Sequence, residues 1–318
     1  MLKTILIVTT GGTIAMKNAH QLLKAEELLH YFPSFTGIAN VVVEEFITIN
    51  SAAILPQHWV QLDALLNRQL ARPDIDGAVL LHGTDSLEES AFFLNLSLQS
   101  AKPLILTGAM RYLDDRSSDG STNLYNAVRL AASPAAHSQG PLVLMNEHIF
   151  AARDVLKYDN LRLHTFRSPY GPLGSVDPDS IRFYRHTSRP HTLATAFDLA
   201  QASTTTLPLV PLLADYTGFR PALFQSLLAG PIDGLVVQSF AGGRRSVGMS
   251  EALKALRHRG LPIVVASRIM EGPLVPPQTE EGLFYAEDLS PQKARILLLL
   301  SLLMGHDTTQ LQQNFRNY

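Results

Sequence analysis

Two short clusters combine glycine with hydroxyl and carboxylate side chains, and each could place a reactive group beside a bound molecule. Residues 10–13 read Thr-Gly-Gly-Thr, and residues 82–85 read His-Gly-Thr-Asp. Glycine lets the backbone turn sharply and approach a ligand closely, which would bring Thr13, Thr84 or Asp85 next to it. From composition alone, a simpler interpretation has about equal weight: both clusters are turns whose Thr and Asp side chains cap the following helices.

Other common chemistries lack their sequence patterns. Neither cluster completes a G-x-G-x-x-G or G-x-x-x-x-G-K-[ST] phosphate-binding loop, and no G-x-S-x-G nucleophile elbow occurs. The eleven histidines show no H-E-x-x-H or comparable ligand spacing, and the chain has no cysteine. The sequence therefore predicts neither a metal nor a cofactor, and it excludes thiolate nucleophiles and disulfides.

The composition limits the domain number and the partners. A chain of 318 residues exceeds most single cores, so two domains are expected, and 46 % hydrophobic residues are enough to build both. The formal net charge of −2 gives no basic field that would collect nucleic acid or an anionic membrane surface. The expected partner is a small neutral or anionic molecule.

Two apolar segments bear on location. The run at 4–8 leads directly into the first glycine cluster and leaves no room for the parts of a signal peptide, so a cytoplasmic location is expected. The segment at 294–304 is too short to span a bilayer and carries Arg295 at its start. It is predicted to be a buried helix, and no membrane partner is expected.

The clusters lie in an alternation of strands and helices. β-branched runs predict strands at 4–9, 41–49, 78–82, 104–107 and 142–145, and longer periodic segments predict helices at 22–30, 56–70, 87–100 and 122–132. Such alternation is typical of parallel strands joined by helical crossovers. Ligands bind at the carboxyl ends of strands in such sheets, and both clusters follow a predicted strand there.

The remaining sequence predicts a second, smaller domain. Turn-rich text between 141 and 186 indicates antiparallel strands that complete an N-terminal domain at 1–186, and small polar residues predict a linker at 187–206. Over 207–318, strands are predicted at 207–213, 234–239 and 262–267, and helices at 221–229, 250–258, 291–304 and 308–315. The predicted fold class is α/β with two doubly wound domains: a larger, mostly parallel sheet with a β-hairpin region, and a smaller parallel sheet.

Longer motifs around both clusters resemble the bacterial-type L-asparaginase family. Residues 7–15, Ile-Val-Thr-Thr-Gly-Gly-Thr-Ile-Ala, are similar to its first signature, and residues 77–87, Gly-Ala-Val-Leu-Leu-His-Gly-Thr-Asp-Ser-Leu, to its second. Further similar segments extend the resemblance over nearly the whole chain; they lie at 107–111, 119–128, 153–157, 170–174 and 291–295. The resemblance implies an amidohydrolase that needs no cofactor and acts on a small amide.

The resemblance implies a role for each matching residue of the catalytic machinery. Thr13 would be the nucleophile that attacks the side-chain amide and forms an acyl-enzyme, which water then hydrolyses. Thr84, Asp85 and Lys157 would form a second polar group that eases proton removal, because a free threonine hydroxyl is a weak nucleophile at neutral pH. In isolation, Lys157 would be interpreted as an ordinary surface lysine.

Substrate contacts are implied in the same way. Backbone N–H groups near Gly83 and Thr84 would donate to the oxyanion, and one such donor is worth about 10²- to 10³-fold in rate. The carbonyl of Ala109 would hold the leaving amide nitrogen. Ser51 and Asp85 would hold the α-carboxylate and the α-ammonium of the substrate.

The chain departs from the family pattern in the loop after the first cluster. Residues 16–21 contain no tyrosine, whereas the family usually has one there that assists the nucleophile. Tyr31, at the end of a predicted helix, and His20 and Lys17 are the nearest side chains that could substitute.

Further departures concern substrate recognition. Ala52 and Ala53 stand where the family commonly has a polar residue and an aspartate. Arg244 occupies a place where an asparagine commonly faces the site of a neighbouring subunit, and Glu280 and Glu281 are the nearest candidates for the acid that the neighbour lends. An unpaired charge in a closed site costs several kcal/mol, so Arg244 is expected either in solvent or against an anionic partner.

Three functions stay open. The leading one is hydrolysis of L-asparagine or a close β-amide, and the second is hydrolysis of another carboxylate-bearing amide, imide or lactone. The third is a non-catalytic sensor that kept the fold. The resemblance also implies a homo-oligomer, a tetramer of two close dimers, because family sites are completed by the neighbour's small domain.

Overall fold

The protein is described from a computed structural model that covers residues 2–32, 34–204, 206–222, 230–275 and 280–318. The chain forms two compact units, Met1–Ala196 and Phe197–Tyr318. Their boundary falls within the segment 187–206, for which the sequence predicts a linker.

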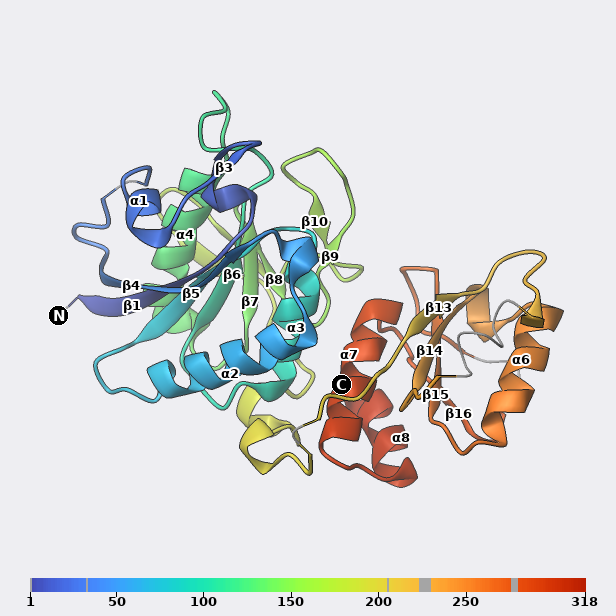
Figure 1. Ribbon diagram of the computed structural model, residues 1–318. Helices are drawn as coiled ribbons and strands as arrows, with labels where there is room; N and C mark the ends of the chain where they lie inside the picture. The colour runs from blue at the N-terminus through green and yellow to red at the C-terminus, as the bar shows by residue number, and fades with distance from the viewer. Residues whose placement is uncertain (1, 33, 205, 223–229, 276–279) are drawn as a thin grey trace. The chain divides into compact units, whose positions relative to one another are not determined.

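The first unit is built on an eight-stranded sheet with the order β12-β11-β8-β7-β6-β5-β1-β4 (Figure 1). Five neighbouring strands are parallel: β4 (Ala39–Ile49), β1 (Lys3–Gly11), β5 (Gly77–Leu81), β6 (Leu104–Thr107) and β7 (Leu142–Met145). The antiparallel strands β8 (His148–Ala151), β11 (Gly174–Val176) and β12 (Ile181–Phe183) complete one edge. A mostly parallel sheet with a hairpin region is thus confirmed.

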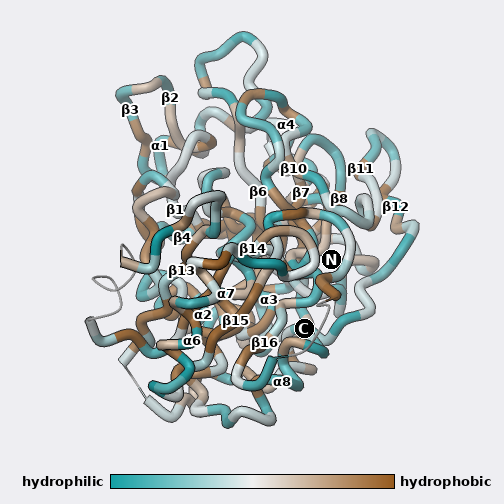
Figure 2. Tube along the Cα trace, turned by 90° about the vertical axis from the view of Figure 1, so that its right-hand side faces the viewer, coloured by the Kyte–Doolittle hydropathy of each residue, from teal (hydrophilic) through white to brown (hydrophobic). Residues whose placement is uncertain are grey.

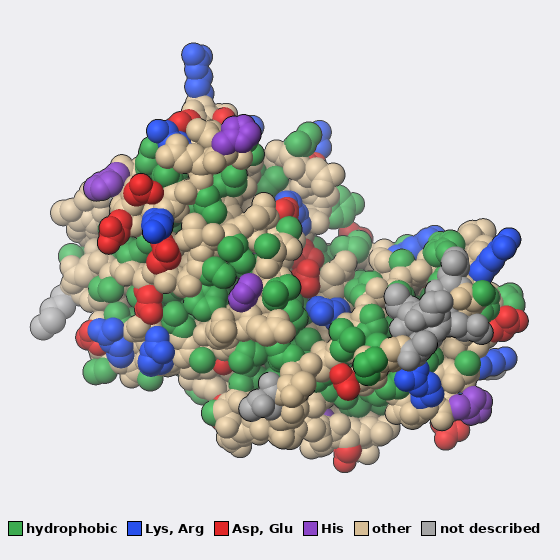
Figure 3. Space-filling model, in the orientation of Figure 1, with side chains coloured by type: hydrophobic (Ala, Val, Ile, Leu, Met, Phe, Trp, Pro, Cys, Tyr) green, Lys and Arg blue, Asp and Glu red, His purple; other side chains and the backbone are tan. Residues whose placement is uncertain are grey.

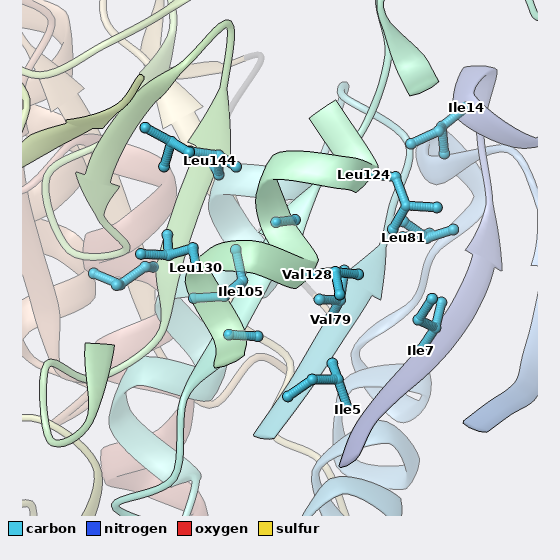
Figure 4. Packing of buried hydrophobic residues seen from close by; sticks show 14 of the residues in the cluster. Ile5, Ile7, Ile14, Val79, Leu81, Ile105, Leu124, Val128, Leu130 and Leu144 are labelled. Atoms are coloured by element: carbon cyan, nitrogen blue, oxygen red, sulfur yellow. The ribbon is translucent and has the colours of Figure 1, made fainter. Parts of the chain in front are cut away.

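Helices cover both faces of this sheet. The helices α2 (Pro56–Leu70) and α3 (Leu87–Ser97) lie on one face, and α4 (Gly120–Ala132) lies on the other (Figure 1). Strand side chains alternate between the faces, so Ile5 and Ile7 meet Val128 of α4 in one buried cluster (Figure 4). Each fully buried side chain of this size stabilises the fold by about 1.5 to 3 kcal/mol, so the strands are held firmly.

A short hairpin follows the first strand and differs from the prediction. It pairs β2 (Met16–Asn18) with β3 (Gln21–Leu22), and the helix predicted at 22–30 is reduced to α1 (Ala25–Leu29). Leu22 pairs with Met16 across the hairpin, so its backbone belongs to a strand and the helix begins later. Another two-stranded sheet, predicted only as part of the antiparallel region, pairs β9 (Leu156–Lys157) with β10 (Phe166–Arg167).

The second unit contains a parallel sheet in the order β13-β14-β15-β16. The strands are β13 (Leu212–Ala214), β14 (Leu235–Ser239), β15 (Ile263–Ser267) and β16 (Leu283–Tyr285), and the helices are α6 (Val247–Arg257), α7 (Pro291–Leu303) and α8 (Thr308–Asn317). Figure 2 shows the hydrophobic character of β14 and β15 along the chain. The predicted parallel C-terminal sheet is confirmed.

Two details of the second unit differ from the sequence prediction. The strand predicted at 207–213 begins only at Leu212, because Pro208 and Pro211 have no N–H to donate to a sheet. The strand β16 was not predicted. The helix predicted at 221–229 lies outside the described residues beyond position 222.

The surface and the apolar helix of the second unit bear on partners. On the face that Figure 3 presents, acidic and basic side chains are interspersed over the first unit. The apolar segment near the C-terminus forms the largely buried α7, as the sequence predicts. Within the described ranges, no helix combines the length and the apolar character needed to cross a bilayer.

Candidate active site

Four loops of the first unit meet at the carboxyl edge of its parallel strands. Strand β1 lies between β4 and β5. The next strand of this sheet along the chain, β4, pairs with one side of β1, and the following strand, β5, pairs with the other side, so the strand order reverses at β1. The loops after β4, β1, β5 and β6 carry Ser51, Thr13, Thr84 and Ala109 in turn. Because ligands bind at such switch points in open α/β sheets, this edge is the candidate site.

Two glycines bring the sequence clusters into direct contact. A Cβ added to Gly12 would lie 2.2 Å from the Cα of Gly83, and a Cβ added to Gly83 would lie 2.6 Å from the Oγ of Ser51. Gly12 also has a φ of 78°, which L side chains rarely adopt. Glycine is therefore required at both positions, and Thr13 and Thr84 directly follow this backbone contact.

Lys157 joins the two polar side chains of the second cluster. Its Nζ donates to the Oγ1 of Thr84 at 2.9 Å and to the Oδ1 of Asp85 at 2.7 Å. Thr84 is buried, whereas the Asp85 side chain is 57 % exposed. The backbone N–H of Lys157 donates to the carboxylate of Glu88 in the first turn of α3. The ammonium is thus held where it can stabilise negative charge on a hydroxyl oxygen.

Ser51 connects the loop after β4 to the loop after β5. Its buried Oγ accepts a hydrogen bond of 3.2 Å from the Asp85 N–H, and its carbonyl accepts one of 2.7 Å from the Ser86 hydroxyl. A serine hydroxyl can also donate one hydrogen bond. In the part of the chain that the structure describes, this donor has no acceptor, so it can serve a ligand.

The loop after β6 is held by Asp119, which directly precedes α4, and by Asn123 in the first turn of α4. The carboxylate of Asp119 accepts from the N–H of Met110 at 3.0 Å, and the Nδ2 of Asn123 donates to the Gly108 carbonyl at 2.9 Å. Ala109 lies fully buried between these two anchors. Among the described residues, no backbone or side-chain donor bonds the Ala109 carbonyl, which leaves it to accept from a ligand.

Thr13 stands at the start of the 3₁₀ helix η1 (Thr13–Ala15) and is partly exposed. Ile14 and Ala15 are buried and fix this short helix to the core. No partner of the Thr13 hydroxyl is found within the described ranges. A partly exposed hydroxyl that makes no hydrogen bond to the described residues, and that lies next to the Gly12–Gly83 contact, is suited to attack a bound carbonyl group.

Family comparisons cover both units. A family model described as "Asparaginase, N-terminal" matches residues 4–189, and one described as "Glutaminase/Asparaginase C-terminal domain" matches residues 209–315. The chain belongs to the asparaginase family. It is therefore an amidohydrolase by descent, as the motifs at 7–15 and 77–87 indicated.

Full-length relatives agree with this assignment. The chain is 35 % identical to L-asparaginase 2 of Bacillus subtilis, over 100 % of this chain and 87 % of the relative. It is 33 % identical to the glutaminase-asparaginase of Acinetobacter glutaminasificans, over 99 % of both chains. The crystal structure of the "Probable Cytoplasmic L-asparaginase" from Campylobacter jejuni has a TM-score of 0.92 and 34 % identity, covering 99 % of this chain and 100 % of that one. The α/β fold class is confirmed.

The residues that depart from the asparaginase pattern lie in three places. Ala52 and Ala53 are exposed on the 3₁₀ helix η2 (Ser51–Ala53), next to the Ser51 hydroxyl. Tyr31 follows α1 and is 38 % exposed. Arg244 is exposed in the second unit, whereas Glu280 forms ion pairs with Arg245 and Arg257. A role for Arg244 or Glu280 in an asparaginase site stays a prediction.

Several supporting residues of the asparaginase site carried no role in the sequence prediction. Asp119 and Asn123 were noted only as matching residues, although their spacing of four places them on one face of a helix. Ser86 and Glu88 follow the second cluster immediately and could have been suspected from that position. His82 was noted only as a member of the cluster.

Proposed function

We propose that this asparaginase-family chain hydrolyses the side-chain amide of L-asparagine to L-aspartate and ammonia, with Thr13 as the nucleophile. The observation that carries the proposal is the contact of Lys157 with Thr84 and Asp85 beside the Gly12–Gly83 contact. The relatives named L-asparaginase support the substrate class. Ammonia release from a panel of amino-acid amides and dicarboxylic monoamides tests the proposal, and no release from any of them would refute it.

In the first half-reaction, the Thr13 oxygen attacks the amide carbon. The negative oxygen of the tetrahedral intermediate accepts hydrogen bonds from N–H groups of the loop at 83–84. The Thr13 proton passes to the leaving nitrogen, which the Ala109 carbonyl orients, and ammonia departs. The product of this step is a β-aspartyl ester on Thr13.

In the second half-reaction, water hydrolyses the ester. The Thr84 hydroxyl positions this water, and the Lys157 ammonium lowers the cost of negative charge on the Thr84 oxygen, from which it lies 2.9 Å. The attacking oxygen becomes part of the aspartate carboxylate, and the ester oxygen regains its proton as the Thr13 hydroxyl. Asparagine and water thus yield aspartate and ammonia.

The α-groups of the substrate are assigned to Ser51 and Asp85. The free O–H of Ser51 donates to the α-carboxylate. The exposed Asp85 carboxylate has its Oδ1 on Lys157 and offers its other oxygen to the α-ammonium. Asp85 therefore orients the substrate and also fixes Lys157.

The exposed alanines favour a second candidate, an amide substrate without a free α-ammonium. If Ala52→Gln/Ala53→Asp restores ammonium recognition, we expect the KM for asparagine to fall about tenfold, because a hydrogen bond to a charged group is worth about 1.5 to 3 kcal/mol. The kcat should stay within about threefold, since such contacts stabilise ground and transition states alike. Steady-state ammonia release measures both constants, with succinamate as the substrate that lacks the ammonium.

A matched control is Ala135→Asp, at an exposed position of the 3₁₀ helix η3 (Pro134–Ala136), which should change neither constant. If the parent already binds asparagine tightly and the restored variant gains nothing, another residue supplies the contact. The argument from Ala52 and Ala53 would then be wrong.

We further propose a homotetramer of two close dimers, in which Tyr216, Arg244 and Glu280 approach the site of a neighbouring copy. Arg244 and Tyr216 are exposed in the second unit, as an interface role requires. Closed symmetric assemblies are the commonest oligomers of soluble enzymes. Sedimentation is expected to show about four times the monomer mass, and a fully active monomer would refute this assembly.

A cytoplasmic location is proposed on the likeness to the Campylobacter jejuni protein, which is described as a probable cytoplasmic enzyme. Fractionation of the source cells tests it, with activity expected alongside cytoplasmic markers. Activity released with the periplasmic fraction would contradict it.

A further inference from the structure

A buried chain of hydrogen bonds leads to the loop after β5 from the helices behind it. The Nδ1 of His82 lies 2.7 Å from the Gly83 carbonyl oxygen, and its Nε2 lies 2.9 Å from the Oγ of Ser90 on α3. The indole Nε1 of Trp59 on α2 donates to the same Ser90 Oγ at 2.8 Å. His82 and Ser90 are fully buried, and Trp59 is 4 % exposed.

The two ends of this chain fix the position of every proton in it. The Trp59 indole can only donate, and the Gly83 carbonyl can only accept. His82 must therefore donate from Nδ1 to Gly83, and a neutral imidazole then accepts at Nε2 from the Ser90 hydroxyl. The Oγ of Ser90 in turn accepts the hydrogen bond that the Trp59 indole donates. Each of the three hydrogen bonds can therefore run in one direction only, from a fixed donor to a fixed acceptor.

The buried surroundings keep His82 in this neutral state. Burial lowers the pKa of His82 from its ordinary value to about 4, and the bond to Gly83 opposes this only in part. Above about pH 5 the imidazole is therefore uncharged. It cannot serve as a proton acceptor through Nδ1, because that atom carries the hydrogen.

The bond to the Gly83 carbonyl fixes a whole peptide plane. The peptide between Gly83 and Thr84 is trans, so its C=O and its N–H point in opposite directions. With the carbonyl held by His82, the Thr84 N–H is directed away from the buried chain. Within the described residues this N–H has no acceptor.

We propose that His82 is a positioning residue, which aims the Thr84 N–H at the reacting oxygen through a one-directional chain from Trp59 and Ser90. The use of that N–H as an oxyanion donor rests on the proposed amide hydrolysis. These hydrogen bonds tie the rotation of this peptide to the packing of α2 against α3, where the rings of Trp59 on α2 and Phe93 on α3 meet at a tilt of 31° with their centroids 5.4 Å apart.

Two substitutions separate the two bonds of His82. In His82→Asn the amide nitrogen takes the place of Nδ1 and can still donate to Gly83, whereas in His82→Gln it takes the place of Nε2 and can reach only Ser90. Each variant loses one hydrogen bond, so their thermal midpoints should be similar. We expect kcat to fall about 10- to 100-fold in His82→Gln and to stay within about threefold in His82→Asn, with KM little changed in both.

Equal losses of kcat in the two variants, or no loss in either, would overturn the proposal. His306→Gln is the control, because His306 also bonds a buried side chain, Asn314, at 2.9 Å, but lies in the other unit. If His82→Gln does not fold, Ser90→Ala replaces it: His82 then loses the hydroxyl that donates to its Nε2 but keeps the bond to Gly83, so a smaller fall in kcat is expected. The shape of the pH profile should be unchanged in every variant.

A second measurement does not depend on activity. The ¹⁵N chemical shifts of the parent imidazole should show a hydrogen on Nδ1 and none on Nε2 from pH 5 to 8. A hydrogen on Nε2, or protonation of the imidazole within this pH range, would refute the proposed chain of hydrogen bonds. If the parent releases no ammonia, the proposed function and the oxyanion role fail together, and the ¹⁵N spectrum alone decides whether the chain exists.

Discussion

The Thr13→Ala variant is expected to release ammonia from L-asparagine at least about 10³-fold more slowly than the parent, because an acyl-enzyme needs this oxygen. Its thermal midpoint should hardly change, since the Thr13 side chain is partly exposed and caps no helix. Steady-state ammonia release and circular dichroism on the same preparation measure the two effects. Near-normal turnover in Thr13→Ala would move the nucleophile assignment to Thr84.

Two further variants sharpen this test. Thr13→Ser keeps the hydroxyl and should retain part of the activity, whereas Thr84→Val should lose turnover by orders of magnitude. Groups that act as a unit fail together, so Thr13→Ala combined with Thr84→Val should be little worse than either alone. Acid quenching followed by peptide mass analysis should find the β-aspartyl group on the peptide that contains Thr13.

Removal of the positive charge at Lys157 is also expected to lower turnover strongly. Lys157→Met keeps most of the apolar stem of the side chain but loses the ammonium and its contacts with Thr84 and Asp85, so kcat should fall about 10²- to 10⁴-fold. The ion pair with the largely exposed Asp85 is worth only about 0 to 1 kcal/mol, so the thermal midpoint should fall by no more than about 4 °C. Turnover and thermal unfolding are measured side by side.

The chain offers a matched control for this substitution. Lys3 forms an ion pair of the same length, 2.7 Å, with Asp76 at the start of β1, away from the carboxyl edge of the sheet. Lys3→Met should therefore show the stability effect of a lost ion pair without the loss of turnover. If Lys157→Met keeps kcat within about threefold of the parent, Lys157 takes no part in the chemistry.

The differences between the predicted and observed elements have local causes. Prolines shorten β13 by removing backbone donors, and pairing of Leu22 across the hairpin delays the start of α1. The missed strand β16 has three residues, too few for a periodic signal to stand out. The strongly apolar elements β5 and α7 were predicted close to their observed bounds, since both are buried along nearly their whole length.

The sequence by itself determined the family, the fold class and the residues whose chemistry is at stake. Motifs such as those at 7–15 and 77–87 are local, because a sharp turn needs glycine and acyl transfer needs a hydroxyl at fixed places along the chain. The alternation of strands and helices also predicted which ends of the strands would carry the site. No contact between distant residues followed from these patterns alone.

The tertiary structure decided which of these groups meet. Lys157 lies 73 positions from Thr84, and the pairing of β9 with β10 together with the bond to Glu88 holds its backbone where the ammonium reaches that hydroxyl. The direction of the Thr84 N–H likewise depends on His82, Ser90 and Trp59, which come from a loop and two helices. Such contacts depend on strand order and helix packing, because these set distances between segments that no local pattern encodes.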